Sequence, residues 1–425
     1  MILPGSPFVA YRGSELFIEG CSLHALARRH GSPLYVYSRS AMLASLASYQ
    51  RALAGRRHLI CYAMKANSTL AVLQTFAQAG CGFDIVSGGE LERVLAAGGD
   101  PSKVVFSGVG KTRAEMRRAL EAGVRCFNVE SEPELELLSQ VAVECGRTAQ
   151  VSLRVNPDVD AGTHPYISTG LKGNKFGIAH QRAVVTYQRA AQLPGLAVAG
   201  IDCHIGSQIT ETGPYLDALD RVLDLVEAVE QSGIALHHLD LGGGLGITYT
   251  DETPPSAEAL VRRLLARIDE RGHGHREILF EPGRSLVGNA GVLVTEVLYL
   301  KPGEAKNFCI VDAAMNDLMR PAMYEAYMQI VACRQRDDTA ALTWDVAGPV
   351  CESGDWLGRD RSLAVQPGDT LAVLSAGAYG MSMASNYNTR GRAAEVMVDG
   401  DQAWLIRERE AANELFRLEK LLPSA

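Results

Sequence analysis

The chain has 425 residues, of which 47% are hydrophobic and 21% charged, and its formal net charge is −8 at pH 7. This length exceeds what one ordinary core holds, so two domains are expected. The negative charge and the lack of a Lys/Arg-rich tract argue against a nucleic-acid partner.

The nine cysteines are scattered and form no C-x-x-C pair. This spacing is typical of neither a disulfide framework nor a zinc site, so we expect no bound metal and a reducing compartment. The stretch Met1–Phe17 lacks the basic and apolar regions of a signal peptide. No apolar run approaches the roughly 20 residues of a membrane helix. The sequence therefore predicts a cytoplasmic protein that does not enter a membrane.

Short β-type runs alternate with longer amphipathic stretches between about Arg57 and Pro282. Eight such runs separated by helices predict a parallel (β/α)₈ barrel of the TIM type, with a doubly wound sheet as the alternative. The expected strands are His58–Ala63, Gly82–Val86, Lys103–Ser107, Arg125–Val129, Ala149–Val155, Leu196–His204, Leu236–Leu241 and Glu277–Glu281. The expected helices include Leu70–Ala79, Leu91–Ala97, Arg113–Ala122, Glu132–Glu144, Tyr215–Gln231 and Glu258–Arg271.

The pattern changes after Arg284 to strands separated by Gly, Pro and Asp turns, with only Ala411–Leu418 expected to be helical. We predict a second, all-β domain, a sandwich or barrel, over residues 286–425. The turn-rich residues 1–35 are expected to join it, and residues 36–285 to form the barrel. The expected strands are Val292–Leu300, Phe308–Val311, Gln329–Ala332, Leu342–Val346, Thr370–Leu374, Ala393–Val398 and Gln402–Ile406.

Polar residues collect at the carboxyl ends of the expected barrel strands, where TIM-type barrels carry their chemistry. A single polar residue there is usually just solvated, but seven of the eight strands end in one, which predicts a large polar site. These residues are Lys65, Asp84, Ser87, Asn128, Glu130, Arg154, Asn156, His204, Gly242–Gly244, Glu281 and Arg284.

Two glycine-containing stretches resemble nucleotide motifs without completing them. Ser107–Thr112 lacks the first glycine of a P-loop, and Gly242–Gly246 lacks the last glycine of the dinucleotide fingerprint. The second stretch still suits a phosphate cradle, because the loops after strands seven and eight commonly hold phosphate in such barrels. A merely flexible loop is the alternative.

A phosphate site and a lysine in one barrel mouth indicate pyridoxal 5'-phosphate, although a strand-end lysine is more often a surface residue. The segment Tyr62-Ala-Met-Lys-Ala-Asn67 resembles the cofactor-lysine motif of the pyridoxal-phosphate-dependent decarboxylases with an alanine-racemase-like barrel, which act on diaminopimelate, ornithine or arginine. Further resemblances lie in His204-Ile-Gly-Ser-Gln208, Gly242-Gly-Gly244, Glu281-Pro-Gly-Arg284, Gly348–Asp355 and Gly377-Ala-Tyr-Gly380, so the likeness covers nearly the whole chain.

The resemblance implies a role for each matching residue in cofactor binding. Lys65 would bond to the cofactor aldehyde, and His204 would stack on the pyridine ring. Glu281 would pair with the pyridine nitrogen, which a nearby carboxylate keeps protonated. The remaining residues implied to bind the cofactor are Asp84, Ser207, Gly242, Gly243, Gly244, Gly283, Arg284 and Tyr379.

The resemblance also implies the substrate, meso-2,6-diaminopimelate, which would be decarboxylated to L-lysine in lysine biosynthesis. Its distal carboxylate would meet Arg284, Arg320 and Tyr324, because a guanidinium can bind a carboxylate bidentately. Glu352 would take the distal ammonium group, and Cys351 would donate the proton that replaces CO₂. Tyr379 is also expected at the substrate.

In this family the cysteine–glutamate loop reaches the neighbouring subunit, so a homodimer with shared active sites is expected. Three alternatives remain: a related decarboxylase acting on ornithine, arginine or carrier-bound glutamate, a silent regulatory homologue, and a racemase. A silent homologue would lack Lys65 or Cys351, which are both present. A racemase would not need the Cys351–Glu352 loop and would retain the carboxylate.

Overall fold

The computed structural model describes residues 2–159 and 175–423. The chain divides into two compact units, one of residues 43–247 and 253–286, the other of residues 1–42, 248–252 and 287–425. Within the described ranges, no helix has the length and apolar character needed to span a membrane.

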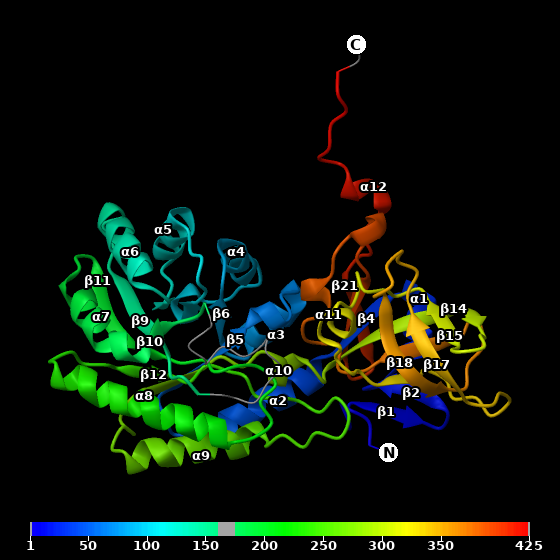
Figure 1. Cartoon of the computed structure of the whole chain (residues 1–425), viewed down its shortest axis with the longest axis horizontal. Coiled ribbons are helices and arrows are strands. Elements are labelled where there is room, and N and C mark those ends of the chain that lie inside the picture. The colour runs from blue at the N-terminus through cyan, green and yellow to red at the C-terminus, as the bar shows by residue number, and fades with distance from the viewer. Residues whose placement is uncertain (1, 160–174, 424–425) are drawn as a thin grey trace. The chain divides into compact units, whose positions relative to one another are not determined.

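The first unit is a closed ring of eight parallel strands, so the predicted barrel is confirmed (Figure 1). Each strand pairs with the next one in the chain, and the last pairs with the first, which excludes the open doubly wound sheet. The strands are β5 (His58–Ala63), β6 (Gly82–Ile85), β7 (Val104–Phe106), β8 (Cys126–Val129), β9 (Ala149–Asn156), β11 (Leu196–Asp202), β12 (His238–Asp240) and β13 (Glu277–Phe280). A short strand, β10 (Ile178–Ala179), adds to β9.

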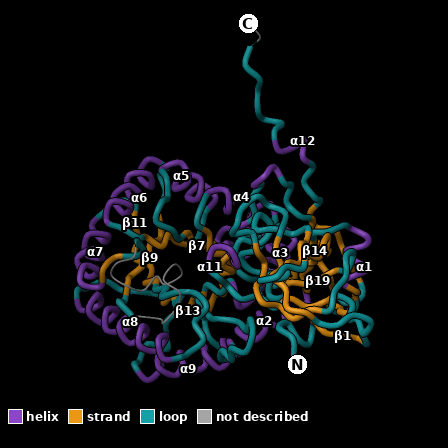
Figure 2. Tube along the Cα trace, turned by 45° about the vertical axis from the view of Figure 1, so that its right-hand side comes forward, coloured by secondary structure: helices purple, strands orange, loops and turns teal. Residues whose placement is uncertain are grey.

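Helices surround this ring, as Figure 2 shows for α5 to α9. Polar caps fix where several of them begin: Ser87, Ser131 and Ser256 each accept a hydrogen bond from the first turn, and Thr112 forms a capping box with Glu115. The helices are α2 (Arg39–Leu53), α3 (Leu70–Gln78), α4 (Gly88–Ala96), α5 (Arg113–Ala122), α6 (Glu132–Glu144), α7 (His180–Gln192), α8 (Gly213–Gln231), α9 (Ala257–Glu270) and α10 (Arg284–Val287). Of these, α2, α7 and α10 were not predicted.

A buried cluster of small and branched side chains lies inside the ring, contributed by β5, β7, β8, β11 and β13. This apolar filling makes the barrel a packed core rather than a pore. Polar chemistry is thereby confined to the strand ends. The cluster consists of Leu59, Cys61, Val105, Cys126, Ala199 and Leu279.

The second unit is rich in strands, as predicted. Its main sheet has the order β18-β17-β15-β14-β4-β20-β21, with β16 and β19 pairing beside β14. These strands are β4 (Leu34–Ser38), β14 (Gly291–Lys301), β15 (Phe308–Val311), β16 (Ile330–Ala332), β17 (Leu342–Ala347), β18 (Trp356–Leu363), β19 (Thr370–Val373), β20 (Ala394–Asp399) and β21 (Gln402–Arg407). A small sheet of β1 (Val9–Arg12), β2 (Glu15–Ile18) and β3 (Cys21–Ser22) precedes them.

Two features of this unit differ from the expectation. Strand β18 was missed, because its charged residues break the apolar pattern of a strand. Besides α12 (Ala412–Leu415) the unit contains α11 (Arg320–Tyr324), so the expectation that only Ala411–Leu418 would be helical after Arg284 was wrong. The N-terminal part, expected to be turn-rich, contains the helix α1 (Leu23–His30). Helix α1 forms because Ser22 caps it and its Leu23, Leu26 and Ala27 face the core.

Candidate active site

The predicted site residues fall in two groups, one in each unit. The barrel unit holds Lys65, Asp84, His204, Ser207, Gly242, Gly243, Gly244, Glu281, Gly283 and Arg284, all at the carboxyl ends of strands or in the turns that follow them. The second unit holds Arg320, Tyr324, Cys351, Glu352 and Tyr379.

Lys65 lies in a single 3-10 turn, Met64–Ala66, directly after β5. Its Nζ is 2.5 Å from Oδ2 of Asp84, which ends the neighbouring strand β6. The lysine side chain is 38% exposed and the aspartate side chain is fully buried. The Lys65 amine at the mouth of the barrel is therefore oriented by the buried carboxylate of Asp84.

Gly283 packs against the turn that carries this amine. A Cβ at position 283 would lie about 3.1 to 3.2 Å from atoms of Ala63 and Ala66, which is tight. The Ala63 N–H also donates to the carbonyl of Pro282. The end of β13 thus supports the Lys65 turn directly.

The three glycines after β12 are required by close approach of the backbone. A Cβ on Gly243 would lie 2.1 Å from the carbonyl oxygen of Glu281, and one on Gly244 would lie 2.4 Å from that of Gly206. Gly242 and Gly244 also have φ values of 62° and 98°, in the left-handed region. The run packs against backbone carbonyls that follow β11 and β13, and its Gly242 and Gly243 N–H groups donate to the side chains of Asp240 and His204.

His204 follows β11 and is fixed by this run, because its Nδ1 accepts a hydrogen bond from the Gly243 N–H at 3.2 Å. Burial lowers the pKa of His204 well below its ordinary value, and the cations Arg154 and Lys65 lower it further. The ring is therefore neutral at neutral pH. A flat, uncharged ring held by one nitrogen can pack against an aromatic ligand.

Arg284 is buried at the first position of α10, and its guanidinium is oriented by Ser207. Nη2 and Nε of Arg284 donate to Ser207 Oγ at 2.9 and 3.3 Å. A planar cation fixed in this way beside a glycine run suits an anionic ligand group.

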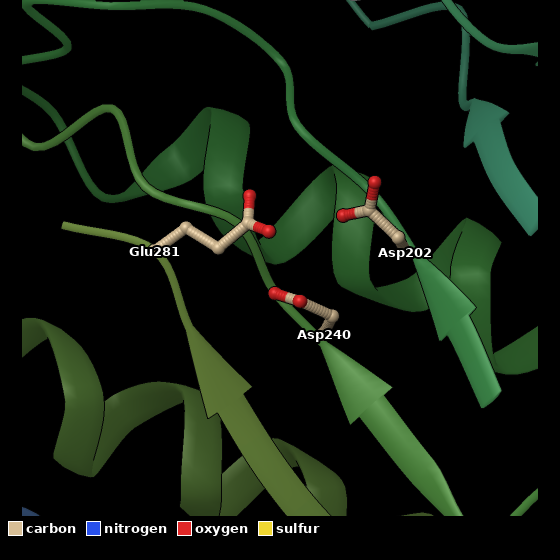
Figure 3. A group of neighbouring side chains, drawn as sticks. All are labelled: Asp202, Asp240 and Glu281. Carbon is tan, nitrogen blue, oxygen red and sulfur yellow. The ribbon is translucent and has the colours of Figure 1, made fainter. Parts of the chain in front are cut away.

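Glu281 belongs to a group of three buried carboxyl groups. One carboxylate oxygen each of Asp202, Asp240 and Glu281 lies within 4.8 Å of the others, and Figure 3 shows the three side chains converging from neighbouring strand ends. Burial raises the pKa of Glu281 well above its ordinary value, and its acidic neighbours add to the shift. Asn128 Nδ2 donates to Glu281 Oε1 at 3.2 Å.

Asp202 and Asp240 were not predicted as site residues. They lie within the predicted strands Leu196–His204 and Leu236–Leu241, where no motif marked them. The available signal was an acid within a predicted barrel strand, since a buried carboxylate needs a partner.

A second buried network lies on the neighbouring strands. Arg154 Nη1 donates to Glu130 Oε1 at 2.9 Å, and the Glu130 N–H donates to Glu134, which is paired with Lys111. Arg154 and Glu130 were noted at strand ends from the sequence, whereas Lys111 and Glu134 were missed. The network holds the ends of β8 and β9 in register beside the mouth.

In the second unit, Arg320 is buried between two tyrosines. Its guanidinium carbon lies 5.2 Å from the ring centroid of Tyr249 and 5.8 Å from that of Tyr324. Tyr324 ends the short helix α11 that Arg320 begins. Both rings are close enough to attract the guanidinium through cation–π contacts. Tyr379 lies in a turn with a φ of 56°.

The loop Gly348–Asp355 presents Cys351 and Glu352, both exposed. Asp355 is buried at its base, where its carboxylate accepts hydrogen bonds from the N–H groups of Val350 and Met315 at 2.7 and 2.6 Å. The Cys351 N–H donates to Asn388 Oδ1 at 3.0 Å. A rigid base therefore carries an exposed thiol next to an exposed acid.

Comparisons with known proteins agree with this arrangement. The family described as "Pyridoxal-dependent decarboxylase, pyridoxal binding domain" matches residues 39–288. The chain is 61% identical to the diaminopimelate decarboxylase of Pseudomonas aeruginosa over 415 residues, covering 97% of this chain and 99% of that one. It is 57% identical to the diaminopimelate decarboxylase of Vibrio cholerae, covering 96% and 97%.

A solved structure agrees as well. That of the M. jannaschii diaminopimelate decarboxylase in complex with L-lysine has a TM-score of 0.94 at 39% identity and covers 99% of both chains. Identity of this extent over the full length, on a barrel with a lysine, a glycine run and a buried acid at one mouth, establishes the family. The chain is a carboxy-lyase of the pyridoxal-dependent decarboxylase family, and within that family it belongs to the diaminopimelate decarboxylases.

Proposed function

We propose that this enzyme removes one carboxyl group from meso-2,6-diaminopimelate to give L-lysine and CO₂, as the last step of lysine biosynthesis. The support that carries the proposal is the 61% identity to a diaminopimelate decarboxylase over nearly the full chain. The L-lysine bound to related enzymes is the product expected from this substrate.

The barrel residues fit pyridoxal 5'-phosphate. Lys65 supplies the amine for the cofactor aldehyde, next to the buried carboxylate of Asp84. The phosphate would lie against Gly242–Gly244, where side chains are excluded, with Ser207, Arg284 and Tyr379 around it. Glu281 would face the pyridine nitrogen, and His204 would cover the ring.

Pyridoxal phosphate held by these residues would accept the electron pair left on the substrate when CO₂ departs. The chain's own residues then have distinct tasks. Glu281 stabilises positive charge on the ring nitrogen, which keeps the ring electron-deficient. Lys65 supplies the amine that releases the product. Cys351 donates a proton to the reacting carbon in place of CO₂.

The substrate's distal end carries both a carboxylate and an ammonium group, so its recognition needs groups of both signs. We assign the carboxylate to Arg284, Arg320 and Tyr324, and the ammonium to Glu352. Arg320 is held by two aromatic rings, which supports bidentate binding. Ornithine and arginine have only a cationic distal end, which two arginines would repel.

We further propose that the enzyme is a homodimer in which Cys351 and Glu352 of one protomer complete the site of the other. The exposure of both residues on a rigid loop supports this assignment. A cytoplasmic location is proposed because nine unpaired, scattered cysteines fit a reducing compartment.

A product assay tests the reaction. The purified enzyme should release CO₂ and form L-lysine from meso-diaminopimelate when pyridoxal phosphate is added. Turnover of ornithine, arginine and glutamate should be about 10⁴-fold lower, the discrimination expected when buried polar groups of the site are left unpaired. Faster release of CO₂ from ornithine or arginine would contradict the proposed substrate. Conversion of meso-diaminopimelate into its LL or DD isomer without release of CO₂ would instead identify a racemase.

A further inference from the structure

Three buried carboxyl groups in the barrel mouth lie too close together for all of them to be ionised. Asp202, Asp240 and Glu281 are each at most 6% exposed, and their nearest oxygens are within 4.8 Å. Like charges at this spacing repel strongly in a protein interior, and burial itself disfavours the ionised form. The carboxylate cluster, as we call these three residues, must therefore hold a proton when no cation is added to it.

The surroundings of the carboxylate cluster do not neutralise it. The nearby cations are already paired, Arg154 with Glu130 and Lys65 with Asp84. Buried thiols stay neutral, because burial raises their pKa. The charged and titratable groups facing the carboxylate cluster are Lys65, Asp84, Arg125, Glu130, Arg154, Cys61, Cys126 and Cys203, which leaves an excess of acids.

Oxygens that receive no hydrogen bond show where the carboxylate cluster can hold its proton. Asp240 Oδ1 accepts from the Gly242 N–H at 3.0 Å, whereas Asp240 Oδ2 and Asp202 Oδ1 receive no hydrogen bond from the described residues. A shared proton would satisfy these oxygens.

We propose that Asp202 and Asp240 are positioning residues that share a proton with Glu281 until the cofactor binds. The inference rests on the proposed placement of the pyridine ring beside Glu281. On binding, an O–H bond of the carboxylate cluster breaks, and the proton passes to an unprotonated ring nitrogen or, when the ring arrives protonated, to the solvent. The positive charge of the pyridine ring would then replace that of the proton. Glu281 would stay ionised and pair with the protonated ring nitrogen.

This exchange links folding and cofactor affinity to pH. Burial raises the pKa of Asp240 to about 6 and raises those of Asp202 and Glu281 as well. Since the folded-state pKa values exceed the unfolded ones, the stabilisation is fully present below the unfolded pKa of about 4. It is lost progressively as pH rises from there to the folded-state pKa values, of which that of Asp240 is about 6. The cofactor-free protein should thus lose stability over this range, and a bound cation should prevent the loss.

The test measures the unfolding temperature of the cofactor-free and the cofactor-loaded protein between pH 5.5 and 8.5. In wild type, we expect a clear fall with pH for the cofactor-free form and a smaller fall for the loaded form. Asp240→Asn should reduce the fall in the cofactor-free form by at least half, because an amide has no proton to lose. Glu121→Gln, which alters an exposed acid on α5, is the matched control and should behave as wild type.

The dissociation constant of pyridoxal phosphate gives a second readout. Protonation of the free cofactor affects both proteins equally. The ratio of the wild-type dissociation constant to that of Asp240→Asn therefore reports the protein's own protonation. This ratio should change about tenfold per pH unit at most, the limit for one linked proton. Asp202→Asn provides an independent variant should Asp240→Asn fail to fold.

Parallel pH curves for wild type and the soluble variant would overturn the proposal. So would a stoichiometric divalent cation in purified wild type that is lost in Asp240→Asn, because the carboxylate cluster would then be a metal site. If the enzyme turns over meso-diaminopimelate and the pH curves are parallel, the shared proton is ruled out and the proposed function stands. If the pH curves differ as expected and meso-diaminopimelate is not turned over, the shared proton stands and the proposed function is ruled out.

Discussion

Neighbouring residues decide the chemistry of each side chain in the barrel mouth. Lys65 lies beside an opposite charge, Asp84, whereas Glu281 lies among like charges. The two environments give one group a fixed orientation and the other a raised pKa. Among the nine cysteines only Cys351 is exposed, and a buried thiol such as Cys203 has its pKa raised by burial. Only an accessible thiol can exchange protons with a substrate.

Replacing Cys351 tests its proposed role at the residue scale. Cys351→Ala should retain the cofactor and lose about 10²–10⁴ in kcat, the usual contribution of a positioned acid. Borohydride reduction followed by mass analysis should find a pyridoxyl adduct on Lys65 in both proteins. Cys145→Ala, which changes a partly buried thiol on the outer face of the barrel, serves as the control. Wild-type turnover in Cys351→Ala would remove this residue from the mechanism.

At the scale of elements, the glycine run is shaped by the two strands beside it. Resemblance pointed to Gly242–Gly244 as a phosphate loop, and the structure adds that the carbonyls of Cys203, Gly206 and Glu281 exclude a Cβ at these positions. A loop chosen only for flexibility would not be under this constraint. Packing of β11 and β13 therefore sets the path of the backbone.

Gly243→Ala tests this constraint. The new Cβ would lie 2.1 Å from the Glu281 carbonyl oxygen, so the ends of β12 and β13 must separate. We expect the free energy of unfolding to fall by about 1–3 kcal/mol, the usual cost of overpacking. Cofactor affinity should fall in the same variant. Gly213→Ala, where a Cβ meets nothing within 4 Å, should leave both unchanged in denaturant titrations. Unaltered cofactor affinity in Gly243→Ala would argue against a phosphate at this run.

At the scale of the whole molecule, the chain distributes the proposed chemistry over two units. The proposed cofactor groups except Tyr379 belong to the barrel unit, whereas Cys351 and Glu352 belong to the strand-rich unit. In a dimer with shared sites, each site would draw these groups from different protomers.

Mixing two inactive variants tests shared sites. Lys65→Ala lacks the cofactor amine and Cys351→Ala lacks the proton donor, so neither homodimer should be active. In a random mixture half of the dimers are hybrids with one intact site of two, which predicts recovery of about a quarter of wild-type activity. Mixing should be followed by size-exclusion chromatography to verify exchange of protomers. Exchange without recovered activity would place both groups in the same protomer's site.

Sequence by itself determined the barrel and proposed its main site residues. Strand periodicity marked all eight barrel strands to within a few residues, because most are short runs of β-forming residues separated by helical stretches. Lys65, His204 and Glu281 were proposed as site residues because they stand in distinctive local motifs. Local motifs and strand periodicity depend only on nearby residues, which a sequence displays directly.

Tertiary structure alone decided which distant groups share a charge environment. Asp202 and Asp240 carry no motif, and they matter because barrel closure brings β11, β12 and β13 side by side. Tertiary pairing also revealed that β4, from the N-terminal region, lies between β14 and β20. Burial and proximity of like charges depend on the closed sheet, and no pattern along one strand records its neighbours.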